Sequence, residues 1–338
     1  MTTTTAPPQT GTARTTLLLG GAAAALAGAL LLSLAVGSKP TAPDQVWAAL
    51  TGTADPHTTA VVESRHPRTA LGVLAGAALA LAGLLMQGIT RNPLADPGLL
   101  GVNAGAAAAV VTATAILGPA STAATVWWAL PGALAAGLVA YSVGGRESGG
   151  GTVRLVLAGA VVSAVLTAYV QAVSLNMPEV FDSYRYWVVG SLAGRGFDAA
   201  VAVLPFVAVG ALLALLLAGG LNALALGEET ATSLGANPVL VRSGGLVAAT
   251  LLAAGATAAA GPIAFVGLAV PHVVRALVGG DFRHQVPLAL LAGPALLLLA
   301  DVVGRFVLRP TELMVGVVTA FVGAPFLFYA VRRMRETP

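Results

Sequence analysis

Runs of about twenty apolar residues recur along the whole chain of 338 residues. A helix that crosses the roughly 30 Å hydrocarbon core of a bilayer needs about that length, because its backbone must satisfy its own hydrogen bonds there. Only 9% of the residues are charged, against roughly 25% in soluble domains. The sequence therefore predicts an all-α integral membrane protein with about ten transmembrane helices, near residues 17–36, 69–89, 99–117, 124–143, 153–174, 199–220, 239–259, 263–278, 287–308 and 313–331.

The number of spans sets the position of the two termini. An even number places both on one side of the membrane, and the cytoplasmic side is favoured because most arginines then lie inside. Residues 1–14 are rich in Thr and Pro and predict a disordered cytoplasmic tail, followed by a single transmembrane domain at 15–335. A cleaved signal peptide is the alternative for the N-terminus, but the apolar run at 17–36 exceeds the usual ~7–15 residues of a signal core.

Ionisable residues are nearly absent from the predicted spans, so no catalytic residue is expected. The main exception is Asp301, one helical turn before Arg305, a spacing typical of an ion pair on a helix surface, here near the outer interface. There is no cysteine, and the four histidines show no HExxH spacing, so no metal site is expected. The net charge of +3 comes from arginines at the ends of apolar runs, where lipid head groups explain it better than nucleic acid.

The single lysine of the chain limits how it can use ATP. A Walker A loop needs the pattern GxxxxGK[ST], and Lys39 is followed by proline. The chain therefore cannot hydrolyse ATP by such a loop. If ATP drives transport, the nucleotide sites lie on another polypeptide, and a cytoplasmic surface of this chain must contact it.

The best candidate for that surface is residues 221–242, "LNALALGEETATSLGANPVLVR". Its leucines are spaced as on short amphipathic helices, a pair of glutamates opens a second helical turn, and two glycines separate the pieces. These residues are Leu221, Leu224, Leu226, Leu234, Glu228, Glu229, Gly227 and Gly235. We expect two short helices across the inner membrane interface, with a solvated linker as the alternative.

A polar elbow, "RNPLADPG", interrupts the apolar sequence between the second and third spans. Pro93 and Pro97 cannot donate backbone hydrogen bonds and disfavour helix at the preceding residue, so the second span must end here. Asn92 and Asp96 can accept hydrogen bonds within the turn, and Asp96 stands near the next helix start, where a negative charge suits the helix dipole.

Several long motifs occur in order between about residues 60 and 331: "RHPR", "GAALALAGLLMQGITRNPLADPGLLGVNAGAA", "LNALALGEETATSLGAN", "GPIAFVGLAVPHVVRALVGGDFRHQVPLALLAGPALLLLADVVGR" and "ELMVGVVTAFVGAPFLF". With these motifs the chain resembles the permease subunits of ABC importers for ferric siderophores, haem and cobalamin. The resemblance implies a ten-helix subunit that pairs with a second copy or a close paralogue, with lipid around it. Two cytoplasmic ATPase subunits would bind below, and a substrate-binding protein would dock above.

The resemblance also assigns roles to residues. ATP with Mg would be bound by the partner ATPase, and no cofactor is expected on this chain. The loop after the sixth span would form coupling helices whose leucines fill a cleft of the ATPase; its residues are Leu221, Asn222, Leu224, Leu226, Gly227, Glu228, Glu229, Leu234 and Gly235. The outer-face arginines expected to pair with acidic residues of the binding protein are Arg65, Arg68 and Arg305.

Two further assignments follow from the resemblance. The translocation path would run along the fifth span and the segment after it, where the polar side chains are Tyr169, Gln171, Ser174 and Asn176. The elbow would be a cytoplasmic signature turn, serving packing rather than contact with ATPase or substrate; its residues are Asn92, Pro93, Asp96 and Pro97.

The predicted function is import of a ferric siderophore, or of a related chelate such as haem or cobalamin, across a bacterial cytoplasmic membrane. ATP-driven alternating access, powered by a separate subunit, is the expected mechanism. An ion-coupled secondary transporter is the alternative, but it would ordinarily need ionisable or broken-helix sites near the membrane centre, and the sequence offers few. The motifs select neither the chelate nor between a homodimer and a heterodimer.

Overall fold

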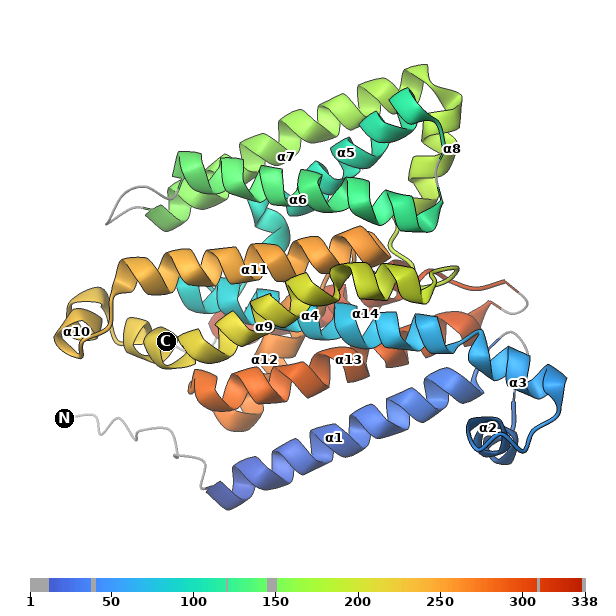
Figure 1. Cartoon of the computed structure of the whole chain (residues 1–338). Helices are drawn as coiled ribbons and strands as arrows, with labels where there is room; N and C mark the ends of the chain where they lie inside the picture. Colours follow the sequence, from blue (N-terminus) through green and yellow to red (C-terminus); the bar gives the residue numbers. More distant parts are fainter. Residues whose placement is uncertain (1–11, 38–40, 120, 145–150, 309–310, 336–338) are drawn as a thin grey trace.

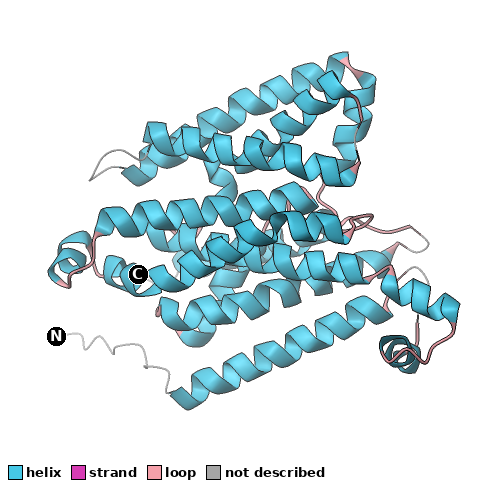
Figure 2. Cartoon of the chain, viewed as in Figure 1, coloured by secondary structure: helices cyan, strands magenta, loops and turns pink. Residues whose placement is uncertain are grey.

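The computed structural model describes residues 12–37, 41–119, 121–144, 151–308 and 311–335. Every regular element in these ranges is a helix (Figure 2). The first half of the chain forms α1 (Thr12–Ala35), α2 (Pro43–Leu50), α3 (Pro56–Glu63), α4 (His66–Thr90), the 3-10 turn η1 (Pro97–Leu100), α5 (Val102–Leu117), α6 (Thr122–Gly144) and α7 (Gly151–Asn176). The second half forms α8 (Pro178–Trp187), α9 (Phe197–Ala225), α10 (Glu228–Ser233), α11 (Pro238–Ala260), α12 (Val266–Val278), α13 (Phe282–Val307) and α14 (Val315–Arg335).

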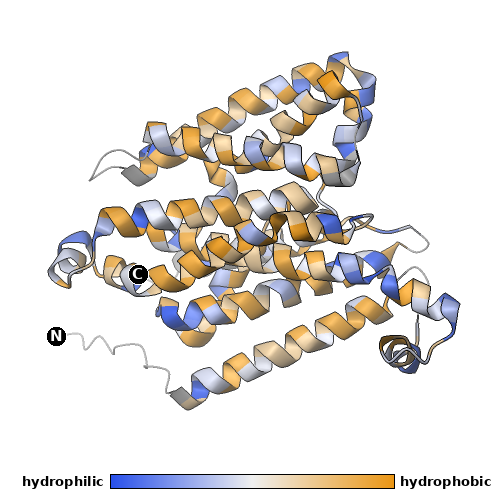
Figure 3. Ribbon diagram, in the orientation of Figure 1, coloured by the Kyte–Doolittle hydropathy of each residue, from blue (hydrophilic) through white to orange (hydrophobic). Residues whose placement is uncertain are grey.

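Ten of these helices correspond to the ten predicted spans. Within the described residues, seven are long and apolar enough to cross a membrane, and α5, α12 and the described part of α14 are shorter apolar helices. Apolar residues cover the sides of the long helices, while hydrophilic residues gather at their ends (Figure 3). The prediction of an all-α membrane protein with ten membrane helices is confirmed, although α5 and α12, with 16 and 13 residues, are shorter than the ~20 residues of a full span.

Helix α4 lies at the centre of the bundle and packs against α9, α11, α12 and α13 (Figure 1). Its buried residues are mostly alanine, glycine and leucine. Small residues let neighbouring backbones approach closely, which replaces the hydrophobic driving force that lipid-surrounded helices lack. At Gly83 a Cβ atom would lie 1.8 Å from the carbonyl oxygen of Gly267, so α4 and the start of α12 meet backbone to backbone.

Helices α5, α6 and α7 form a second layer beside this central group (Figure 1). A Cβ atom at Gly105 would lie 2.3 Å from the carbonyl oxygen of Gly132, so α5 and α6 also meet through glycines. Helix α7 is mostly exposed along its length. The exposed side of α7 therefore forms part of the lateral surface of the bundle.

The two ends of the bundle carry different short helices (Figure 1). One end holds α10 and the first turn of α1, and the other holds α2, α3 and α8. We call them the inner and the outer end, because the sequence places α10 in the cytoplasm. Residues 1–11 of the predicted tail lie outside the described residues, and Thr12 to Arg14 already belong to α1, so the helix begins before the predicted end of the tail.

Candidate functional site

At the inner end, the short helix α10 connects the long helices α9 and α11. Helix α10 begins at Glu228 and is preceded by Gly227 with φ +115° and followed by Gly235 with φ +80°. Both are backbone conformations that residues with a side chain rarely adopt, so glycine permits the two turns. Of the two short helices predicted here, the second, at Glu228 and Glu229, is confirmed, whereas the first is wrong, because Leu221 to Ala225 continue the long helix α9. The two acidic residues stand in the first turn of α10, where the helix dipole favours negative charge.

The four leucines of this region divide into two pairs. Leu226 and Leu234 flank α10 and are 66% and 64% exposed. Leu221 and Leu224 are fully buried, because they lie in the last turns of α9, which faces the core of this chain. The expectation that all four fill a cleft of a partner is therefore wrong for Leu221 and Leu224, and the exposed pair alone is available.

Polar contacts tie both sides of α10 to the bundle. Arg242 in the first turns of α11 forms an ion pair with Glu228. At the end of α9, Asn222 donates a 2.6 Å hydrogen bond to Asp281 and accepts one of 2.8 Å from the backbone N–H of Phe282. Burial raises the pKa of Asp281, but hydrogen bonds from the backbone N–H of Arg283 and the side chain of Asn222 together hold this pKa below its ordinary value. These contacts connect α10 to α11, and the end of α9 to the start of α13.

The polar elbow after α4 makes the turn bonds that the sequence predicts. The Asn92 side chain accepts a hydrogen bond of 2.9 Å from the N–H of Leu94, and the Asp96 side chain accepts one of 2.8 Å from the N–H of Gly98. Asp96 caps η1, and burial raises its pKa despite that hydrogen bond.

The elbow also connects helices that are distant in the sequence. Arg91, in a left-handed conformation at the end of α4, donates to the carbonyl oxygen of Leu224 at the end of α9. The carbonyl oxygen of Pro93 contacts Nε2 of His272 on α12 at 3.0 Å. Sequence reasoning missed Arg91, although an arginine next to a predicted helix end is a known cap for carbonyl groups. The elbow therefore joins α4, α9 and α12 near α10.

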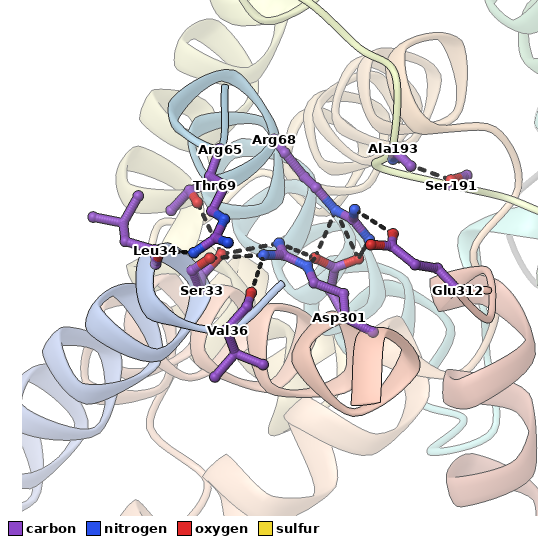
Figure 4. A network of polar contacts seen from close by, with 11 residues as sticks. Ser33, Leu34, Val36, Arg65, Arg68, Thr69, Ser191, Ala193, Asp301 and Glu312 are labelled. Atoms are coloured by element: carbon purple, nitrogen blue, oxygen red, sulfur yellow. Dashed lines mark hydrogen bonds and ion pairs between the residues drawn. The ribbon is translucent and has the colours of Figure 1, made fainter. Parts of the chain in front are cut away.

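At the outer end, five charged side chains and one serine, from four parts of the chain, meet in what we call the outer charge cluster (Figure 4). Its members are Ser33, Arg65, Arg68, Asp301, Arg305 and Glu312. They come from α1, the start of α4, α13 and the segment before α14. Figure 4 shows the Arg68 side chain reaching both Asp301 and Glu312.

The carboxylate of Asp301 is the centre of the outer charge cluster. It is fully buried and accepts hydrogen bonds of 2.8–3.2 Å from Arg68, and it also pairs with Arg305 one turn later on α13. The predicted pair of Asp301 and Arg305 is confirmed, but it is not on a helix surface, since Arg305 is 1% exposed. Burial without partners would be costly for these groups, so their mutual bonds hold them in place.

Two of the arginines also cap the end of α1. Arg305 donates to the carbonyl oxygens of Ser33 and Val36 at 2.7 and 2.9 Å, and Arg65 donates to those of Leu34 and Ala35. These carbonyl groups have no partner inside the helix and carry its negative dipole end, which guanidinium groups stabilise. Arg65 and Arg305 are buried in this role, so they are not the freely accessible outer-face charges that the sequence suggested.

The four residues expected to line the path do not share one face of α7. Tyr169 and Asn176, seven residues apart, are exposed on the same side, whereas Gln171 is exposed about half a turn away. Ser174 is buried, and its hydroxyl has no hydrogen-bond partner. The Tyr169 hydroxyl lies 2.8 Å from that of Thr112 and lines a cavity of about 630 Å³ between α5, α6 and α7. Burial thus separates Ser174 from the three exposed residues, and of these only Tyr169 and Asn176 share one side of α7.

No group of three or more potential metal-ligating side chains lies together in the described part of the chain. The polar clusters at the two ends of the bundle are held by hydrogen bonds and ion pairs within the chain.

Known proteins are similar to this chain in sequence and fold. Residues 25–333 match the model of the FecCD transport family. The chain belongs to the FecCD family. In this family the ATPase that uses ATP is a separate subunit, and an importer permease also works with a substrate-binding protein. This FecCD protein is therefore a multi-pass permease of the cytoplasmic membrane, and the ion-coupled alternative is set aside.

Individual relatives agree with the FecCD assignment. The chain is 48% identical to the ferric enterobactin transport system permease protein FepD of Escherichia coli, over 90% of this chain and 92% of that protein. It is 42% identical to the Fe(3+)-citrate import system permease protein YfmD of Bacillus subtilis, over 80% and 81% of the two chains. A solved inward-facing ABC transporter assigned to the metal-chelate type superposes with a TM-score of 0.81 at 26% identity, covering 94% of this chain and 99% of that one.

Proposed function

We propose that this FecCD permease imports a ferric siderophore by ATP-driven alternating access, as one of two permease subunits. The observation that carries the mechanism is the exposed apolar pair, Leu226 and Leu234, on either side of α10 at the inner end. The ferric chelates in the names of the relatives support the cargo. ATP and Mg are bound by two ATPase subunits, and this chain holds no cofactor.

The coupling step rests on the contacts around α10. Contact with water is unfavourable for the two exposed leucine side chains. Their burial in an apolar cleft of an ATPase would therefore stabilise the complex. Arg242, Asn222 and Arg91 bind this region to α11, α13 and α4. Nucleotide binding that moves the ATPases therefore tilts several membrane helices together. The energy comes from the different affinities of the ATPase states for the two permease conformations.

We place the second permease copy, or a close paralogue, against the exposed surface of α7. Lipid chains offer no hydrogen bonds to side chains such as Gln171 and Tyr169, and polar groups inside a membrane helix ordinarily face a partner or a water-filled path. The path then runs between the copies along α7, past Tyr169 and Asn176 on one side of the helix and Gln171 about half a turn away. Ser174 is left out of it, because it is buried within this chain.

We propose that the binding protein docks at the outer charge cluster and that Arg68 is the residue it contacts. Arg68 is 14% exposed, whereas Arg305 is 1% exposed behind it. An acidic side chain of the binding protein can therefore reach Arg68 first. Arg65 and Arg305 support this contact by holding α1 and Asp301 in position.

The coupling surface can be tested by cross-linking, because the chain has no cysteine of its own. We expect Leu226→Cys to cross-link to an ATPase with engineered cysteines along its cleft, with a yield that changes between ATP-bound and nucleotide-free states. Leu138→Cys, equally exposed but on the membrane-spanning α6, is the matched control and should not react. Equal cross-linking of both variants, or none at Leu226→Cys with every cleft cysteine, would overturn the assignment of α10.

A further inference from the structure

The outer charge cluster contains two carboxylates with very different surroundings. Asp301 is fully buried and is held by both Arg68 and Arg305. The side chain of Glu312 is 27% exposed, and within the described part of the chain its ion pair is to Arg68 alone, at 2.6 Å. The charges alternate in the order Arg305, Asp301, Arg68 and Glu312 (Figure 4), and Glu312 is the last and the most exposed of the four.

From this asymmetry we infer that Glu312 occupies the position on Arg68 that a carboxylate of the docked binding protein takes, so that Glu312 is an internal competitor for docking. The inference rests on the proposed docking at Arg68. An incoming carboxylate offers Arg68 the same charge-assisted hydrogen bond that Glu312 now provides. One negative group then replaces another, and the charge of the cluster stays balanced.

Only Glu312 is free to leave its place. If Asp301 moved away, the buried guanidinium group of Arg305 and the partly buried one of Arg68 would lose their common counter-charge, which proteins tolerate poorly. Glu312 can rotate its side chain into water without moving the backbone. The adjoining backbone is fixed, because the N–H of Leu313 donates a 3.0 Å hydrogen bond to the carbonyl oxygen of Gly304.

The position of Glu312 suits it to report docking to the membrane helices. It stands three residues before the start of α14 at Val315. Arg68 stands in the first turn of α4, the central helix of the bundle. In the undocked protein the ion pair links the segment before α14 to α4, and a docked carboxylate breaks this link while keeping Arg68 paired.

The test is the sign of a change in affinity. Glu312→Gln keeps the shape of the side chain but removes the charge that competes for Arg68. In the complete transporter, reconstituted in nanodiscs, we expect this variant to bind the purified binding protein about two- to fivefold more tightly, the range typical of a partly exposed ion pair. The control is Glu63→Gln. Glu63 is the last residue of α3, so this variant removes the same charge at the outer end of the bundle but outside the cluster.

Each outcome decides one point. Tighter binding by Glu312→Gln but not by Glu63→Gln supports competition, whereas unchanged or weaker binding by Glu312→Gln overturns it. Arg68→Gln separates this result from the docking proposal, since unchanged affinity in that variant refutes docking at Arg68 itself. If Arg68→Gln does not fold, Arg68→Lys keeps the charge but loses the forked hydrogen bonds, and it should weaken docking if Arg68 is the contact.

Discussion

Replacing the two exposed leucines beside α10 by alanine should weaken binding of the ATPase by about a hundredfold. Each Leu→Ala change removes three carbon atoms, worth about 0.8 kcal/mol per buried methylene. Leu226 and Leu234 are 66% and 64% exposed, so about two thirds of this surface is available to a partner. The estimate is about 1.6 kcal/mol per residue and about 3 kcal/mol for the double variant, which at 1.4 kcal/mol per tenfold is somewhat over a hundredfold.

The assay is the equilibrium affinity of the purified ATPase for the permease in nanodiscs, measured without nucleotide. The matched control is the double alanine variant of Leu138 and Leu216, which are 67% and 70% exposed but lie within the membrane-spanning α6 and α9. We expect the control to bind the ATPase normally. Wild-type affinity in the variant of Leu226 and Leu234 would refute the role given to α10.

Three further predictions concern thermal unfolding. Gly83→Ala should lower the stability by about 1–3 kcal/mol or more, because its Cβ would overlap a backbone carbonyl of α12, whereas Gly20→Ala on α1, with open space around it, should not; equal melting temperatures would contradict the close approach. Asp301→Asn should cost about 3–5 kcal/mol, since it leaves Arg305 buried without its counter-charge, and a neutral effect would show that the site is hydrated. Asn237→Ala should cost about 0.5–2 kcal/mol by removing the cap of α11, and Asn237→Asp should restore most of it.

The membrane helices could be predicted from the sequence because the bilayer imposes length and apolarity on each of them. The regular spacing of apolar runs places the spans, and the two prolines of the elbow end α4. The same reasoning loses accuracy where helices are short. Helix α5 begins only at Val102 because the 3-10 turn η1 precedes it, and α12 begins only at Val266 because an irregular segment that ends at Phe265, with φ +70°, precedes it.

The site was less predictable, because burial depends on which face a helix turns to its neighbours. Leucine spacing alone does not distinguish Leu224, inside the last turn of α9, from Leu226 just beyond it. The arginines at the outer end were expected to face a partner, but Arg305 meets the end of α1, from the other end of the sequence. Glu312 was overlooked, although an acidic residue among unbalanced outer arginines is a signal that charge counting can detect.

Transport itself tests the central claim most directly. Proteoliposomes that contain this permease with its ATPase, supplied with the binding protein and a ferric siderophore outside and ATP with Mg inside, should accumulate labelled iron. Accumulation should stop when ATP is replaced by a non-hydrolysable analogue, and it should persist when proton and sodium gradients are collapsed. Uptake that follows an ion gradient and ignores ATP would contradict the account.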